Sequence, residues 1–278
     1  MGDVKSSTSG TTQKTEQCVN VQDGKITNDF KKMMEEALRA QMAVLNKRKE
    51  NVENWGVAQS NEFIEIFGIP DYKEIKLEFP YGVRNKHIKF KVMVTARDYI
   101  KTAVLRLHSI CKELSADGEC VNVNVNDHRL QRDANGNAIY DAKGNAVYVD
   151  SIVIRPRTGN YVNFTDNDSY TANVPPSQID GVRPGGYGRV VAVVIGKKFI
   201  DMKLNGKNSK VSTLCHELSH YIRYGNSFEL GGMWTEDMPV DRELDTSDKY
   251  SDYADELKNN KNPVLFQNAY NIERYFEI

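Results

Sequence analysis

The chain has too little cysteine for a disulfide-stapled domain. It contains 4 cysteines among 278 residues, and no two of them form a Cys-x-x-Cys pair. Cys111 and Cys120 lie close enough in sequence to pair, but so few cysteines in a chain of this length favour isolated thiols. We therefore expect no disulfide scaffold.

The sequence also lacks an excess of charge of either sign and any long apolar run. The formal net charge is −1 at pH 7, so no overall field favours nucleic acid or an anionic membrane as a partner. No apolar segment approaches the roughly 18 residues that a membrane-spanning helix needs. The amino-terminal stretch MGDVKSSTSGTTQKTEQ is polar throughout, so we expect no cleavable secretory signal.

The composition changes near residue 26, which suggests a boundary between a tail and a folded part. Residues 1–26 are rich in Ser, Thr, Gly and Gln, and this composition predicts a disordered polar tail. The remaining residues, 27–278, are enough for one large domain or two small ones, and we expect a single domain.

Apolar periodicity predicts both helices and strands. Helices are expected from a cap at Asn28 to about Trp55, in a short segment ended by Gly68 and Pro70, and over 97–114, 211–224 and 263–276. Strands are expected at 87–94, 120–126 and 189–196, the last inside a sheet because it is continuously apolar. A tandem repeat, DANGNAIY followed by DAKGNAVY (133–148), predicts an inserted hairpin or small meander, and the Gly- and Pro-rich segment 157–188 predicts a long irregular loop.

The stretch VSTLCHELSHYIRYG (211–225) contains two histidines four residues apart. On a helix, His216 and His220 project from one face, so their ring nitrogens can bind one Zn²⁺. Glu217 lies about 100° around the helix from His216, where it can reach an attacking water without taking a ligand position. This pattern predicts a catalytic zinc site with Glu217 as the general base.

A catalytic zinc site needs a third protein ligand and an open fourth position. No histidine follows His220, so the third ligand is expected to be a carboxylate, or less often another group, from the remainder of the chain. A thermolysin-like arrangement would use Glu243, although the segment RELDTSD lacks the asparagine that usually precedes that glutamate. The candidates by position are Asp237, Asp241, Glu243, Asp245 and Asp248.

The last part of the chain, roughly residues 210–278, resembles the aspzincin family, the deuterolysin and peptidyl-Lys metalloendopeptidase group. The resemblance is carried by an ordered set of motifs: HELSH, TED (235–237), YSDYADELK (250–258), NP (262–263) and NAYNIERYF (268–276). It implies an α+β, zincin-like fold. It also implies a zinc ion held by His216, His220 and an aspartate, Glu217 as base, and a tyrosine that stabilises the oxyanion.

The aspartate and the tyrosine lie further along the chain than is usual in that family, which suggests an inserted loop. We favour Asp237 as the ligand because paired glycines precede its Thr-x-Asp motif. Asp248 belongs to a second Thr-x-Asp but lies only two residues before Tyr250. Tyr250 is the expected oxyanion donor, with Tyr253 as the alternative.

The resemblance also suggests a specificity pocket. In lysine-specific members, an Asp and a Glu in the motif near the carboxyl terminus face the pocket beyond the scissile bond. Here the corresponding residues are Tyr270 and Glu273, so one carboxylate of the two remains. We expect a relaxed preference for basic or large aromatic residues after the cut.

The expected function is that of a monomeric zinc metalloendopeptidase acting on polypeptide substrates. The alternative is a catalytically silent binding or effector module on a zincin scaffold. The intact HELSH motif favours the enzyme, since a silent scaffold has no need of Glu217. The sequence leaves the location open between the cytoplasm and export by a specialised bacterial system.

Overall fold

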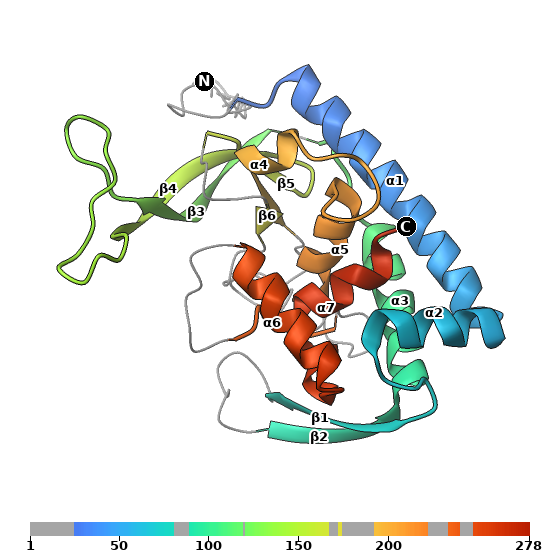
Figure 1. The fold of residues 1–278 in the computed structure, drawn as a ribbon. Helices are drawn as coiled ribbons and strands as arrows, with labels where there is room; N and C mark the ends of the chain where they lie inside the picture. Colours follow the sequence, from blue (N-terminus) through green and yellow to red (C-terminus); the bar gives the residue numbers. More distant parts are fainter. Residues whose placement is uncertain are drawn as a thin grey trace, which may run out of the picture.

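The computed structural model describes residues 25–80, 89–118, 120–166, 172–173, 192–221, 233–239 and 247–278. Apart from its last two residues, the expected polar tail lies outside this part of the chain. The described elements are a mixture of helices and strands. The α+β class expected from the motif resemblance is therefore confirmed at this coarse level (Figure 1).

Three helices form one side of the molecule. α1 (Asn28–Glu53) begins after Thr27, whose hydroxyl accepts the N–H of Phe30, so the cap lies one residue before the expected Asn28. α3 (Ala96–Cys111) packs along α1. α2 (Val57–Phe67) ends, as expected, at Gly68, where φ is 69°. A Cβ on this glycine would meet the carbonyl oxygen of Lys258 at 2.8 Å, so both the backbone angle and the close approach require glycine.

The strands form two sheets. β1 (Glu74–Pro80) and β2 (Lys89–Thr95) pair antiparallel as a two-stranded sheet. The second sheet has the order β3-β4-β5-β7-β6, with β5 and β7 parallel and the other neighbours antiparallel. Its strands are β3 (Val121–Leu130), β4 (Tyr148–Thr158), β5 (Tyr161–Phe164), β6 (Ala172–Asn173) and β7 (Val193–Gly196). β7 confirms the second half of the internal strand expected at 189–196, and residues 189–191 lie outside the described residues.

The segment expected to be a long irregular loop, 157–188, begins instead within strands. β4 continues to Thr158 and β5 follows after Gly159 and Asn160. All four residues of β5 are buried, so side-chain burial outweighs the loop-forming composition of the surrounding sequence. Of the rest of that segment, 167–171 and 174–188 lie outside the described residues.

The tandem repeat forms the turns that connect β3 to β4, at the far left of Figure 1, as the sequence predicts. In each repeat an aspartate accepts two backbone N–H groups: Asp133 from Asn135 and Asn137, and Asp141 from Lys143 and Asn145. These are self-contained turns held by local hydrogen bonds.

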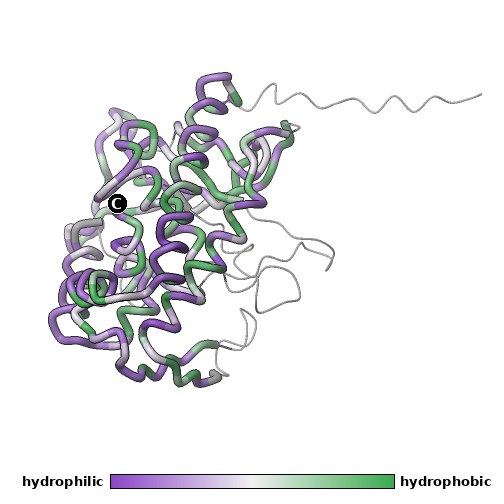
Figure 2. Tube along the Cα trace, turned by 90° about the vertical axis from the view of Figure 1, so that its right-hand side faces the viewer, coloured by the Kyte–Doolittle hydropathy of each residue, from purple (hydrophilic) through white to green (hydrophobic). Residues whose placement is uncertain are grey.

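The hydrophobic core joins the helical side of the molecule to the carboxyl-terminal segment. Phe63 and Phe67 of α2 pack against Phe266, with ring centroids 6.1 and 5.2 Å apart, and Phe67 also contacts Tyr275. Arg48 of α1 stacks over the Tyr275 ring and pairs with Glu62 at 2.9 Å. Figure 2 shows hydrophobic and hydrophilic residues alternating along individual helices, as amphipathic elements require.

The carboxyl-terminal segment was expected to be a single helix but forms three short pieces. They are a 3₁₀ turn (Pro263–Gln267), α7 (Ala269–Glu273) and a second 3₁₀ turn (Arg274–Phe276). The break occurs at Asn268, which has an extended backbone and caps α7 by accepting the N–H of Tyr270. Before this segment, α6 (Ser247–Asn259) packs on α7.

Two of the cysteines are buried free thiols, Cys111 and Cys215. Cys120 is disulfide-bonded, so the expectation of isolated thiols is wrong for this residue. Cysteine pairing cannot be deduced from spacing alone. None of the described helices combines the length and apolar character needed to cross a bilayer.

Candidate metal centre

The histidine motif lies on α5 (Lys210–Ser219), a helix buried along its whole length in the middle of the molecule (Figure 1). Ser209 caps its first turn, and the hydroxyl of Ser212 accepts the N–H of Ser209 in return. α5 packs against α1, α3 and α7, so its direction is fixed on several sides.

α5 ends earlier than expected, at Ser219 rather than Tyr224, and His220 occupies the carboxyl-terminal cap. The carbonyl of Ser219 accepts the N–H groups of Met233 (2.8 Å) and Thr235 (3.2 Å), so it is not used by a further helical turn. Trp234 between them has a φ of 55°, an uncommon angle for this residue type. The end of α5 is therefore joined to the segment 233–237, which carries the TED motif.

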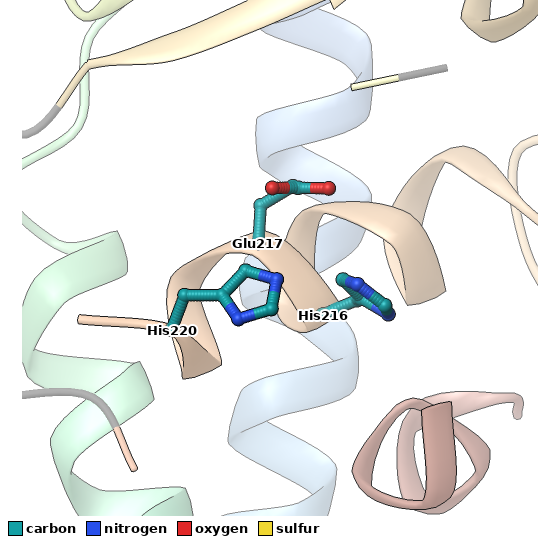
Figure 3. Close-up of side chains that lie close together, drawn as sticks. All are labelled: His216, Glu217 and His220. Carbon is teal, nitrogen blue, oxygen red and sulfur yellow. The ribbon is translucent and has the colours of Figure 1, made fainter. Parts of the chain in front are cut away.

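The two histidine rings lie next to each other at the end of α5. Their centroids are 5.0 Å apart, and potential ligand atoms of His216, Glu217 and His220 all lie within 4.8 Å of one another. Figure 3 shows the two imidazoles at neighbouring positions along α5, with the Glu217 carboxylate above them. Among the described residues, this is the group of His, Cys, Asp or Glu side chains whose spacing suits a metal ion.

Asp237 reaches both histidines with one carboxylate oxygen. Its Oδ1 lies 3.0 Å from Nε2 of His216 and 3.8 Å from Nε2 of His220. The segment that carries it is held on its other side, because Glu236 exchanges backbone hydrogen bonds with Gln267 and Ala269. The residue favoured from the Thr-x-Asp motif is thus placed at the histidine pair. The side chains of Asp241, Glu243, Asp245 and Asp248 lie outside the described residues.

The other nitrogen of each ring faces an acceptor. Nδ1 of His220 lies 2.9 Å from the carbonyl oxygen of Thr235, and Nδ1 of His216 lies 3.2 Å from Oε2 of Glu273. An acceptor at Nδ1 keeps the proton of a neutral imidazole on that atom and leaves the Nε2 lone pair available. Both Nε2 atoms are therefore directed at the region that Asp237 also faces.

The charges around the histidines favour a cation. Burial disfavours a charged imidazole, but the carboxylates of Asp237, Glu273 and Glu217 outweigh it and raise the pKa of His216 well above its usual value. Burial raises the pKa of Asp237, but the rings of His220 and His216 outweigh it and lower this pKa to about 2. A metal ion and a proton would compete for His216.

This donor set suits Zn²⁺. Two imidazole nitrogens and one carboxylate oxygen match the ligand types of catalytic zinc sites, and each histidine has the outer hydrogen-bond partner that such ligands require. The His216 side chain is 7% exposed, whereas that of Asp237 is 44% exposed. Asp237 therefore lies on the more exposed side of the site.

Two tyrosines form an aromatic stack beside the site. The ring of Tyr270 meets that of His216 edge-on at 4.8 Å, and Tyr250 of α6 stacks parallel on Tyr270 at 5.2 Å. Burial raises the pKa of Tyr270, so its hydroxyl stays protonated. Tyr253, the alternative to Tyr250, is partly buried against the hydrophobic core. The structure thus brings Tyr250 and Tyr270 together near the histidines; their roles stay predictions.

Some residues of the site were not identified from the sequence. Thr235 belongs to the recognised TED motif, but its carbonyl contact with His220 has no sequence signal. Ser212 hydrogen-bonds Glu273 at 2.8 Å and could be found only from the docking of α7 on α5. Glu273 itself was expected in a substrate pocket, a role that stays a prediction.

No family model, curated protein or solved structure matches this chain.

Proposed function

We propose that this protein is a zinc metalloendopeptidase with a zincin-like fold. The observation that carries the proposal is the position of Asp237, whose Oδ1 faces Nε2 of both His216 and His220, with the Glu217 carboxylate beside them. His216, His220 and Asp237 would hold the ion. When bound, zinc would supply Lewis-acid activation of the peptide carbonyl and of the attacking water.

Glu217 is the proposed proton carrier. Its carboxylate would accept a proton from the attacking water and deliver the proton to the nitrogen of the leaving amine. The Glu217 side chain is buried within α5, so its position is set by the same helix that positions the two histidines. Glu273 and the Thr235 carbonyl would hold the two imidazole rings in place during the reaction.

The substrate is proposed to be a polypeptide that lies in an extended conformation near β6. Among the described residues, β6 pairs only with β7, and β6 contacts α5. An edge strand offers N–H and C=O groups to an extended peptide, which is a recurrent way of binding unfolded chain segments.

The proposal is tested by incubating the zinc-loaded protein with a denatured, reduced protein and identifying new peptide termini by mass spectrometry. A peptidase generates internal cleavage sites that disappear when zinc is removed. A catalytically silent binding module would retain zinc and polypeptide but generate none, and that result would contradict the proposal.

The proposed third ligand gives a direct prediction. Asp237→Ala is expected to weaken zinc binding by more than the roughly 10–100-fold that follows loss of an outer hydrogen-bond partner, because it removes a ligand oxygen. Zinc affinity, measured by competition with a chromophoric chelator, checks this. Asp248→Ala is the matched comparison and should keep the wild-type affinity. The reverse pattern would move the ligand to the second Thr-x-Asp.

Tyr250 is the proposed oxyanion donor, and Tyr250→Phe isolates its hydroxyl. The substituted ring can keep the stack on Tyr270, so the aromatic surroundings of His216 are preserved. We expect kcat to fall by about 10²–10³, the usual cost of one oxyanion donor, with KM and zinc content little changed. Steady-state kinetics on a fluorogenic peptide measures this. If kcat is retained in Tyr250→Phe and lost in Tyr253→Phe, the role belongs to Tyr253.

A further inference from the structure

We infer that Glu273 is a positioning residue for the metal site, acting through His216 rather than through the substrate. This inference rests on the proposed zinc site and extends it to the carboxyl-terminal segment. The carboxylate lies at the end of α7, and its Oε2 faces Nδ1 of His216 at 3.2 Å. His216 thus has one carboxylate at each nitrogen, since Asp237 faces Nε2.

Both oxygens of Glu273 are engaged within the protein. Oε1 accepts the hydroxyl of Ser212 at 2.8 Å, while Oε2 faces His216. The side chain is 13% exposed. A carboxylate with two internal partners and little exposure is poorly placed to bind an ammonium group of a substrate, because binding would require both contacts to rearrange.

The two helices that meet at this carboxylate, α5 and α7, are held in place by packing and hydrogen bonds. Ser212 belongs to the cap of α5 and is buried. α7 is held by Asn268 at its cap and by Asn271, whose amide donates to the carbonyl of Ala254 in α6 at 2.8 Å. Ile272, next to Glu273, is fully buried. The distance between Glu273 and His216 is therefore set by the packing of three helices.

A carboxylate at this position polarises the imidazole of His216 more strongly than a neutral acceptor would. A charged acceptor on Nδ1 fixes the tautomer and the ring orientation, and it makes Nε2 a stronger donor to a metal. The two histidines differ in this respect, since Nδ1 of His220 faces the neutral carbonyl of Thr235. His216 is therefore expected to be the stronger of the two imidazole ligands.

The test is zinc affinity of the full chain, determined in alkaline buffer by competition with a chromophoric chelator. Glu273→Gln keeps the size of the side chain and an acceptor oxygen but removes the charge. We expect it to bind zinc roughly 10–100-fold more weakly than the wild type, and Glu273→Ala to bind more weakly still. Glu277→Gln is the matched control, because the carboxylate of Glu277 accepts the N–H of Asn208 and, in the part of the chain that the structure describes, hydrogen-bonds neither histidine.

Thermal unfolding separates positioning from a purely structural role. A structural clamp would lower the Tm of the metal-free variant and leave the gain in Tm on zinc addition intact. A positioning residue reduces that gain, because the gain depends on metal affinity. The cleavage-site profile of Glu273→Gln should match that of the wild type, since the residue does not contact substrate.

Wild-type zinc affinity in Glu273→Gln would overturn the inference while leaving the proposed peptidase intact. If the cleavage preference of that variant also changed, Glu273 would return to the substrate pocket. A wild-type protein that takes up no zinc would instead remove the proposed function, and the positioning role with it.

Discussion

Glu217→Gln is expected to lower kcat/KM by about 10²–10⁴ while leaving the protein folded and zinc-loaded. Glutamine has nearly the volume of glutamate, so the buried position on α5 can accommodate it. The amide cannot take a proton from water, so the step that activates the nucleophile loses its base. The measurement is hydrolysis of a fluorogenic peptide, with the zinc content of each sample determined in parallel.

Zinc content is the control that gives this result its meaning. A variant that is inactive because it has lost zinc would report on the metal and not on the base. Glu217→Asp provides a second comparison, because it keeps the carboxylate but withdraws it from the site, and we expect intermediate activity. Activity in Glu217→Gln equal to that of the wild type would show that another group, or none, accepts the proton.

His216→Ala and His220→Ala are each expected to abolish stoichiometric zinc binding and all detectable peptidase activity. Each substitution removes one of two imidazole ligands on a single helix face, and two remaining ligands are fewer than catalytic zinc sites use. Removal of zinc from the wild type with a chelator should give the same loss, and added Zn²⁺ should restore activity. Metal analysis and the peptide assay measure both effects.

The matched control is His108→Gln. His108 is a buried histidine of α3 whose ring lies 2.8 Å from the Asn46 side chain, and it is no part of the proposed site. This variant should keep one zinc per chain. Retention of stoichiometric zinc by His216→Ala would contradict the proposed ligand set, and loss of zinc by His108→Gln would indicate that uptake depends on general stability.

The sequence could predict that His216, Glu217 and His220 lie close together because their relative geometry on one helix is local. The spacing of His216 and His220 determines their relative positions on any helix, and the helical spacing of apolar residues such as Leu214 and Leu218 predicts a buried side for that helix. Asp237 was selected by its motif, and the structure places it at the histidines. This placement depends on backbone N–H groups of the segment that carries Asp237, which donate to the carbonyls of Ser219 and Gln267. No pattern of residue types predicts these hydrogen bonds.

The sequence-based predictions that the structure contradicts failed for one physical reason, which is that tertiary contacts decided the outcome. α5 ends early because the carbonyl of Ser219 bonds a distant segment, and the final helix breaks where the side chain of Asn268 offers an alternative to helical hydrogen bonds. The contact between Glu273 and His216 joins residues far apart in sequence. Such a contact depends on how α7 docks and could not be predicted from residue types.

The burial of α5 limits which substitutions the chain can tolerate. All 10 residues of this helix are buried, including Leu218 and Ser219, which a His-Glu-x-x-His motif nominally leaves free. Leu218 is fully buried in the core, and the hydroxyl of Ser219 bonds both the carbonyl of His216 and the hydroxyl of Thr235. In a library of random variants, we therefore expect these two positions to be nearly as intolerant as the histidines, although neither would touch the metal.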